Sequence, residues 1–196
     1  MELAIIRYNA GNIRSVLFAL ERIGAQAVVT EDPERIRAAG KVIFPGVGEA
    51  SSAMRYLKER GLDTLITGLR QPVLGICLGM QLMCRHSEEN DTGCLGIFPC
   101  EVKRFDAGGS AFKIPHMGWN TVHSLKGSLF GQVPEDAYCY FVHSYYATRC
   151  EHTVAVTEHA QAFSSALQKD NFYGVQFHPE KSAAVGERIL RNFLSL

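Results

Sequence analysis

The chain has 196 residues, 46% of them hydrophobic and 20% charged, which is enough to bury one sizeable core. Twenty basic residues balance twenty acidic ones, so charge gives no argument for binding nucleic acid or an anionic membrane surface. No apolar run reaches the length of a membrane span, and the first residues read as a strand, not as a signal peptide. We therefore expect a single cytoplasmic domain over residues 1–196, with no nucleic-acid or membrane partner.

The first half of the chain alternates between strand and helix patterns. Expected strands lie at 2–8, 26–30, 41–44 and 72–76, and expected helices lie at 12–23, from 32–34 onward, at 50–60, 62–70 and 78–86. Asn12 can cap the first helix, and Gly24 is its stop signal. A repeat of strand and helix predicts an α/β fold with a doubly wound parallel sheet.

The second half contains short strand patterns with few helices between them. The expected strands lie at 100–105, 118–123, 138–145, 153–157, 162–168 and 172–177, and an amphipathic helix is expected at 184–195. We expect these strands to extend the sheet in antiparallel fashion. The segment 106–110 is interpreted as a loop and not as a domain boundary.

Cysteine usage argues against disulfides and against a metal site. The six cysteines lie at 77, 84, 94, 100, 139 and 150. The chain is not a small secreted domain, contains no Cys-x-x-Cys motif and shows no zinc-ligand spacing, so we expect no metal or other cofactor. Five of these residues are interpreted as buried or incidental thiols in a reducing compartment.

Cys77 differs from the others because it lies in Gly-x-Cys-x-Gly at residues 75–79, directly after an expected strand. This is the thiol counterpart of the Gly-x-Ser-x-Gly nucleophile elbow. A buried cysteine near glycines is usually structural, but this turn would expose the sulfur at the carboxyl end of a parallel strand, where ligands bind. The helix that follows would favour the thiolate. Cys77 is therefore the candidate nucleophile.

His178 and Glu180 follow the last expected strand, about one hundred residues after Cys77. A lone histidine there is more often a surface residue, but a carboxylate two positions on can fix its tautomer and stabilise the imidazolium. Cys, His and Glu together are the parts of an activated thiol nucleophile. A solvated charge at a helix start is the other interpretation of Glu180, and His86, His116 and His143 remain competing candidates for the base.

The turn at 45–48, Pro-Gly-Val-Gly, ends a strand expected beside the Cys77 strand. Glycine-rich turns are usually only turns, but backbone N–H groups near Val47, with that of Leu78, can bind the oxyanion of a tetrahedral intermediate. Neither nucleotide-binding glycine motif occurs. Gln81 and Glu89 lie in or just after the helix that follows Cys77, and surface roles for both are as plausible from position alone.

With these residues identified, the whole chain resembles a class I, triad-type glutamine amidotransferase, a family with a flavodoxin-like, mostly parallel sheet. More narrowly, it resembles the glutaminase subunits that serve a cyclase in histidine biosynthesis. The motifs that carry the resemblance are Pro-Gly-Val-Gly at 45–48, Gly-Ile-Cys-Leu-Gly-Met-Gln-Leu at 75–82, Pro-His-Met-Gly-Trp-Asn at 115–120, Phe-Val-His-Ser-Tyr at 141–145 and Gly-Val-Gln-Phe-His-Pro-Glu-Lys-Ser at 174–182.

The resemblance implies roles for particular residues. It implies a catalytic triad of Cys77, His178 and Glu180, and an oxyanion hole made by the backbone amides of Val47 and Leu78. It implies that glutamine is held by Gly48, Gln81, Glu89, Ser144 and Tyr145. A carboxylate suits the α-ammonium group of glutamine, and amide donors suit its carboxylate. Cys77 would attack the side-chain amide and form a glutamyl thioester, which water hydrolyses.

The resemblance also implies a partner, a cyclase subunit with a (β/α)8-barrel fold, in a heterodimer. Ammonia would pass through the barrel to a phosphorylated imidazole precursor, and the products would be imidazole glycerol phosphate, an aminoimidazole carboxamide ribotide and glutamate. The residues implied near the interface are Asn12, Met117, Trp119, Asn120, Tyr140 and Lys181. Trp119 is the only tryptophan, and residue type alone is equally compatible with a core position and with an interface anchor.

One segment departs from the family pattern. The first loop usually reads Asp-Tyr-Gly-x-Gly-Asn, whereas residues 7–12 here read Arg-Tyr-Asn-Ala-Gly-Asn. Asn tolerates positive φ better than most residues, so the turn can survive the change. Three alternatives stay open: an amidotransferase for a purine, folate or carbamoyl precursor, a cysteine peptidase or stress protein of similar fold, and a non-catalytic binding module.

Overall fold

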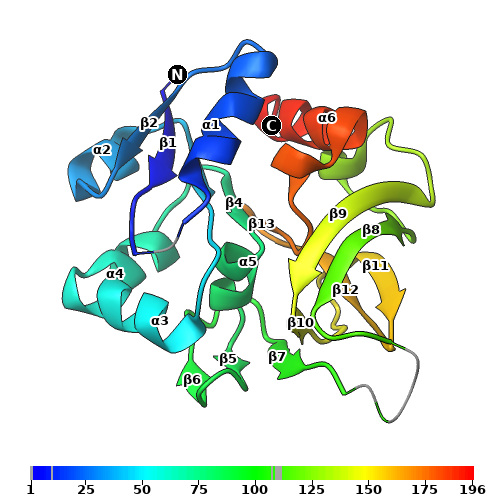
Figure 1. Ribbon diagram of the computed structural model, residues 1–196. Coiled ribbons are helices and arrows are strands. Elements are labelled where there is room, and N and C mark those ends of the chain that lie inside the picture. Colours follow the sequence, from blue (N-terminus) through cyan, green and yellow to red (C-terminus); the bar gives the residue numbers. More distant parts are fainter. Residues whose placement is uncertain (1, 10, 107, 109–111) are drawn as a thin grey trace.

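The computed structural model describes residues 2–9, 11–106, 108 and 112–196, so the expected loop at 106–110 lies mostly outside the described residues (Figure 1). The helices are α1 (Ile13–Arg22), α2 (Pro33–Ala38), α3 (Ala50–Glu59), α4 (Leu62–Thr67), α5 (Leu78–Met83) and α6 (Ala183–Leu194). Two short 3₁₀ helices are η1 (Ser128–Phe130) and η2 (Pro179–Lys181). The first-half helices thus lie where the sequence predicts them, within a few residues.

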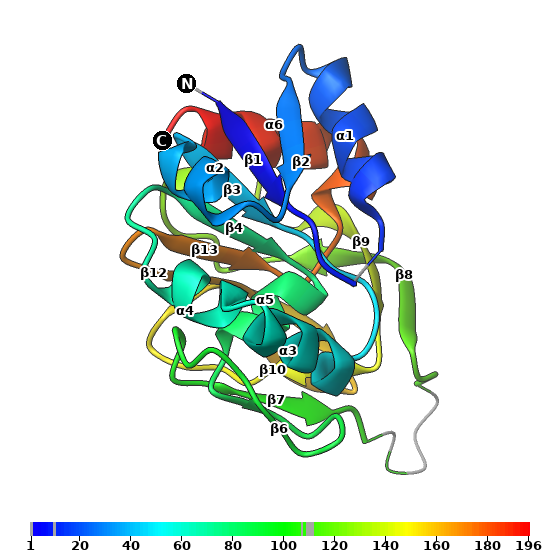
Figure 2. The same cartoon turned by 90° about the vertical axis from the view of Figure 1, so that its left-hand side faces the viewer.

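The main sheet runs in the order β2-β1-β3-β4-β13-β12-β10-β7-β5-β6, with β11 paired to β12. Its strands are β1 (Leu3–Ile6), β2 (Ala27–Thr30), β3 (Lys41–Phe44), β4 (Val73–Ile76), β5 (His86–Ser87), β6 (Thr92–Gly93), β7 (Glu101–Arg104), β10 (Tyr145–Ala147), β11 (Thr153–His159), β12 (Gln161–Lys169) and β13 (Phe172–Val175). Figure 2 shows β1, β3, β4, β13, β12, β10, β7 and β6 following one another down the molecule. The predicted α/β class with a mostly parallel sheet and added antiparallel strands is confirmed.

The second half departs from prediction in two places. The strands β8 (His116–Val122) and β9 (Ala137–His143) do not extend the sheet but pair antiparallel with each other as a separate ribbon. The strand β13 lies parallel to β4 and so belongs to the parallel core. Both outcomes depend on long-range pairing, which a local pattern of alternating residues does not specify.

Two apolar clusters cover the two faces of the sheet. Ile36, Met54, Leu57, Leu65 and Met80 place helices α2 to α5 over one face. The opposite face is covered by α1 and α6 together with the β8–β9 ribbon, whose inner side is buried, as the two views of the cartoon show. No helix in the described part of the chain is long and apolar enough to cross a membrane.

The carboxyl ends of β3, β4 and β13 meet at one edge of the sheet because these strands are parallel neighbours. The segments that follow them are the turn at 45–48, the elbow at Cys77 and the turn at His178. A parallel sheet opens its ligand crevice at this edge. The fold therefore brings together the three segments that the sequence singled out.

Candidate active site

Cys77 occupies a strained turn between β4 and α5, with φ 52° and ψ −109°. Positive φ in a non-glycine residue is uncommon and is typically maintained at functional sites. Its glycine neighbours let the chain pack closely: a Cβ at Gly75 would lie 2.8 Å from the Met80 amide nitrogen, and one at Gly79 would overlap the Phe44 carbonyl oxygen. The flanking glycines are thus required for the elbow to form.

His178 and Glu180 lie behind Cys77, buried in the turn that leads from β13 into η2. The two side chains form a direct pair, with 2.7 Å between His178 Nδ1 and Glu180 Oε1. Ser182 ties this turn to β9, because its hydroxyl donates to the His178 carbonyl (2.7 Å) and accepts from the Tyr140 amide (3.0 Å). The histidine ring is therefore held in one orientation.

The other ring nitrogen, Nε2 of His178, has no hydrogen-bond partner within normal distance in the described part of the chain, although Cys77 is close enough to interact with the ring. Burial on its own would lower the pKa of His178, but interaction with Cys77 and with Glu180 outweighs burial and raises it to about 10. A long contact of this kind is common before a substrate binds. The arrangement favours a protonated His178 beside the Cys77 sulfur at neutral pH.

This pKa has a consequence for stability. A histidine whose pKa rises on folding from its ordinary 6.5 to about 10 stabilises the folded state fully below about pH 6.5, and loses that contribution as pH rises towards 10. We expect the difference in free energy of unfolding between the wild type and a His178→Gln variant to shrink over this range. Urea denaturation of both proteins at several pH values measures it, and a difference that grows with pH would contradict the assignment.

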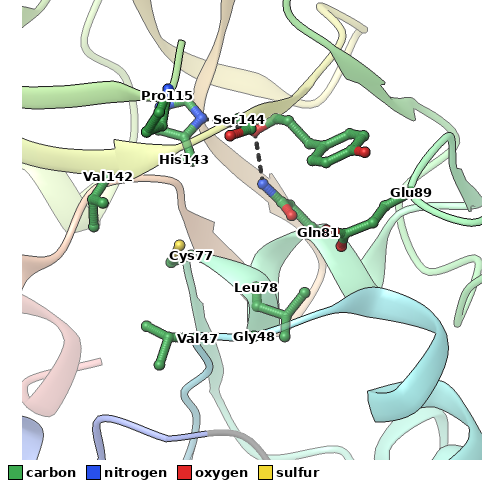
Figure 3. A pocket seen from close by; sticks show the side chains of 11 residues that line it. Val47, Gly48, Cys77, Leu78, Gln81, Glu89, Pro115, Val142, His143 and Ser144 are labelled. Atoms are coloured by element: carbon green, nitrogen blue, oxygen red, sulfur yellow. Dashed lines mark hydrogen bonds between the residues drawn. The ribbon is translucent and has the colours of Figure 1, made fainter.

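A cavity of about 470 Å³ opens in front of the sulfur. Figure 3 shows Cys77 between Val47, Gly48 and Leu78 on one side and Pro115, His143 and Ser144 on the other, with Gln81 and Glu89 at one end. The residues that line it are Val47, Gly48, Cys77, Leu78, Gln81, Glu89, Pro115, Val142, His143, Ser144 and Tyr145. All five predicted substrate-binding residues are among them, whereas His178 is not.

The orientation of Gln81 is set by its neighbours. Its Nε2 donates to the Tyr145 carbonyl (2.9 Å) and to Oε1 of Gln176 (2.9 Å). Both amide protons are thus engaged, so Gln81 offers a carbonyl oxygen to a ligand. Gln176, a buried residue that sequence reasoning did not assign a role, in turn directs its Nε2 at the Cys77 sulfur (3.7 Å).

Glu89 supplies a carboxylate to the same end of the cavity. Its Oε2 accepts from the Ala50 amide at 2.8 Å, which aligns the side chain at the start of α3. Burial raises its pKa, and the nearby Glu49 raises it further. A half-buried carboxylate next to an amide carbonyl suits a ligand ammonium group, because the positive charge of the ammonium would stabilise the partly desolvated carboxylate.

The predicted oxyanion hole is only partly open in this structure. The Leu78 amide donates to the Gly46 carbonyl at 3.2 Å, so its N–H is engaged within the protein. The turn continues through an exposed Val47 to Gly48, whose φ of 139° suits glycine. Rotation of the Gly46–Val47 peptide would move this carbonyl away and release the Leu78 N–H.

The predicted interface residues occupy two locations. Met117 and Trp119 on β8 share the outer face of the ribbon with Tyr140 on β9, and Trp119 is 53% exposed, which excludes a core position. Lys181 lies over the Tyr140 ring, 5.7 Å from its centre. The register adds Tyr138, 61% exposed, which the sequence analysis did not select.

Asn120 and Asn12 take other positions. Asn120 is on the inner face of the ribbon, where it contacts His116. Asn12 stands at the start of α1 with φ 76°, but its side chain does not cap the helix as the sequence suggested. It donates instead to Glu180 Oε1, so the amide that could have capped α1 orients the carboxylate behind His178.

The structure also locates the other histidines that were candidates for the catalytic base. His86 belongs to β5, which lies between β7 and β6, and it contacts Asp91 at 2.8 Å, away from the cavity lining. His143 lines the cavity but points its ring nitrogens at the Tyr145 carbonyl and at His116. Among these candidates, His178 is the one that combines a carboxylate partner with the position behind Cys77.

These features define the class of the protein, and comparison with known proteins agrees. Residues 5–196 match the family described as "Glutamine amidotransferase class-I". Solved structures share the fold: a glutamine amidotransferase from Thermotoga maritima has a TM-score of 0.63 at 18% identity, covering 100% of this chain and 83% of that one. The chain belongs to the class-I glutamine amidotransferases, which are enzymes.

Curated relatives narrow the class. A Bacteroides fragilis protein named imidazole glycerol phosphate synthase subunit HisH is 60% identical over the full length of both chains. The protein of the same name from Bacteroides thetaiotaomicron is 58% identical, also over the full length of both. A third, from Shewanella sediminis, is 47% identical over 98% of this chain and 89% of that protein. Within the family, the chain falls among the HisH subunits.

Proposed function

We propose that the chain is the glutaminase subunit of imidazole glycerol phosphate synthase, acting as one amidotransferase domain over residues 1–196 in the cytoplasm. The observation that carries the proposal is the arrangement of Cys77, His178 and Glu180 at the edge of a cavity whose far end carries Gln81 and Glu89. The relatives' names support the assignment to this synthase.

Glutamine fits the cavity in one direction. Its α-ammonium group would lie against the Glu89 carboxylate and the Gln81 carbonyl oxygen, and its α-carboxylate would take donors from the segment Ser144–Tyr145. The side-chain amide would then point at the Cys77 sulfur. Holding the reacting atoms in this geometry supplies a large part of the rate enhancement before any chemistry occurs.

The reaction proceeds in two halves. The Cys77 thiolate attacks the amide carbon, and the backbone amides of Val47 and Leu78 stabilise the oxyanion. The carbon–nitrogen bond breaks while His178 gives its proton to the nitrogen. The nitrogen leaves as ammonia, and the glutamyl group remains on Cys77 as a thioester. Water then adds as His178 takes one of its protons, and the carbon–sulfur bond breaks to release glutamate and regenerate the thiolate. Glu180 stabilises the imidazolium throughout.

The ammonia would pass to a cyclase subunit with a (β/α)8-barrel fold, in a one-to-one heterodimer. The outer face of the ribbon, where Met117, Trp119 and Tyr138 are exposed beside a partly buried Tyr140, supports this docking. Large aromatic side chains of this kind are typical interface anchors. Lys181 joins this face and directly follows Glu180 in the chain, so a partner bound there would lie beside the triad.

An isotope experiment tests the transfer. Glutamine labelled with ¹⁵N at the side-chain amide is supplied with the cyclase, its ribonucleotide substrate and an excess of unlabelled ammonium. We expect imidazole glycerol phosphate to carry nearly undiluted label, because the ammonia does not mix with solvent. Dilution to the ratio of the bulk pool would contradict direct transfer. A Cys77→Ala control should yield only unlabelled product, made from ammonium.

A further inference from the structure

Two buried histidines of the β8–β9 ribbon stand outside the triad and have no role in the chemistry above. His116 and His143 are directly opposite in the register of β8 and β9, on its inner face. Nδ1 of His116 and Nε2 of His143 are 3.0 Å apart. Nδ1 of His143 lies 2.7 Å from the Tyr145 carbonyl, and Nε2 of His116 lies 3.2 Å from the amide nitrogen of Asn120.

The direction of these hydrogen bonds follows from the Tyr145 end. A backbone carbonyl only accepts, so His143 must carry a proton on Nδ1. If this imidazole is neutral, its Nε2 accepts a hydrogen bond, and His116 must donate from Nδ1. His116 in its neutral form then has an unprotonated Nε2, which needs a donor.

The same direction follows independently from the Asn120 end. The Asn120 amide nitrogen is fixed by the Glu158 carbonyl at 2.9 Å, while its oxygen accepts from the Thr121 amide at 2.8 Å. Asn120 therefore presents an N–H to His116, which must accept on Nε2 and carry its own proton on Nδ1. Both ends give the same assignment, so the network is consistent only with two neutral rings, each protonated on Nδ1.

The surroundings keep both rings uncharged. Burial lowers the pKa of His143 to about 3 and that of His116 to about 4. Phe105 and Phe141 pack against both rings, with the Phe141 ring stacked on His116 at 4.8 Å. Two other titratable groups face the pair: His159, which stacks on His116 at 4.1 Å, and His178. His159 lowers both pKa values further, and His178 lowers that of His143.

The Tyr145 carbonyl, at the end of this chain of hydrogen bonds, belongs to a residue that lines the cavity. Tyr145 oxygen accepts from His143 on one side and from Gln81 on the other (2.9 Å), so both of its lone pairs are used. Through Gln81, the network continues to Gln176 and the Cys77 sulfur. The strand break at Ser144, which separates β9 from β10, is thereby pinned against α5.

We propose that His116 and His143 are positioning residues for glutamine binding: as two neutral imidazoles in a directed hydrogen-bond chain from Asn120, they fix the Tyr145 carbonyl and thereby the wall made by Gln81, Ser144 and Tyr145. The inference rests on the proposed function for the identity of the ligand, but the protonation pattern does not. Neither residue touches the reacting atoms; each acts through the carbonyl of Tyr145.

Ring-nitrogen NMR tests the protonation pattern without any assay of activity. In protein labelled with ¹⁵N-histidine, His116→Gln and His143→Asn variants assign the two rings. We expect both rings to be neutral with the proton on Nδ1, from pH 6 to pH 8, although the Nε2-protonated form is the usual one for histidine in water. Detection of either ring as imidazolium or as the Nε2-protonated form at pH 7 would overturn the proposal.

Kinetics in the complex with the cyclase test the positioning role. The nitrogen of an asparagine side chain can occupy the place of histidine Nδ1, so His143→Asn keeps the donor to Tyr145 while His143→Leu removes it. We expect His143→Leu to raise KM for glutamine about tenfold, the effect of one lost hydrogen bond, with kcat nearly unchanged, and His143→Asn to restore most of the loss.

A packing role would give a different pattern. His159→Leu removes a ring that stacks on His116 but lies outside the hydrogen-bond chain, and it should leave KM unchanged. Equal defects in His143→Leu and His143→Asn, or a loss confined to kcat, would refute the positioning role. If the wild type itself does not hydrolyse glutamine, the proposed function fails, and the NMR result still decides the protonation pattern.

Discussion

Replacing Cys77 with alanine should lower kcat for glutamate release roughly a millionfold, since loss of a nucleophile from a triad has an effect of this size. Cys77 alone among the six thiols has the elbow geometry, faces the cavity and lies beside His178. The variant should keep its fold, because alanine occupies less space at the same backbone position. Glutamate production by wild type and variant, each with the cyclase, measures the effect, and residual activity within tenfold of wild type would contradict it.

The same assignment predicts selective labelling. A glutamine-analogue electrophile should alkylate Cys77 fastest, because burial raises the pKa of Cys139 to about 12 and those of Cys94 and Cys150 to about 11, which keeps these thiols protonated. Peptide mapping after brief exposure identifies the site. A Cys94→Ala variant serves as control and should label as the wild type does, whereas first labelling of Cys84 or Cys139 would refute the assignment.

The triad residues could be selected from the sequence because their signals are local. Glycines flank Cys77 where a turn requires close approach of the chain, and Glu180 follows His178 closely enough to contact it. The strand–helix alternation of the first half likewise reports short-range structure, and the parallel sheet follows from it. These features needed no knowledge of long-range pairing.

Other features depended on contacts between distant segments. Asn12 reads as a helix cap but contacts Glu180, 168 residues away in the chain. His116 and His143 were competing bases in the sequence, and only the register of β8 and β9 pairs them. Gln176 and Ser182 lie in motifs whose residues could be quoted but not assigned roles, because a buried polar side chain acquires its role from its partners.

Partner binding should have the second largest effect, a rise in kcat for glutamine hydrolysis of roughly a hundred- to a thousandfold. The Leu78 N–H is engaged by the Gly46 carbonyl in the isolated chain, so one of the two proposed oxyanion donors is withheld. Restoring a single such donor has an effect of this size. We expect the cyclase with its bound nucleotide to favour the rotated turn, because the ribbon that it would contact lies beside the cavity.

The most direct test is glutamate release from glutamine by the purified chain alone, with the cyclase, and with the cyclase plus its ribonucleotide substrate or a bound analogue. The Cys77→Ala variant is the blank in each mixture. Strong stimulation only in the full mixture is the predicted result, and it would establish the chemistry and the partner together. Hydrolysis that is the same in all three mixtures would contradict the coupling, and no hydrolysis in any of them would contradict the glutaminase itself.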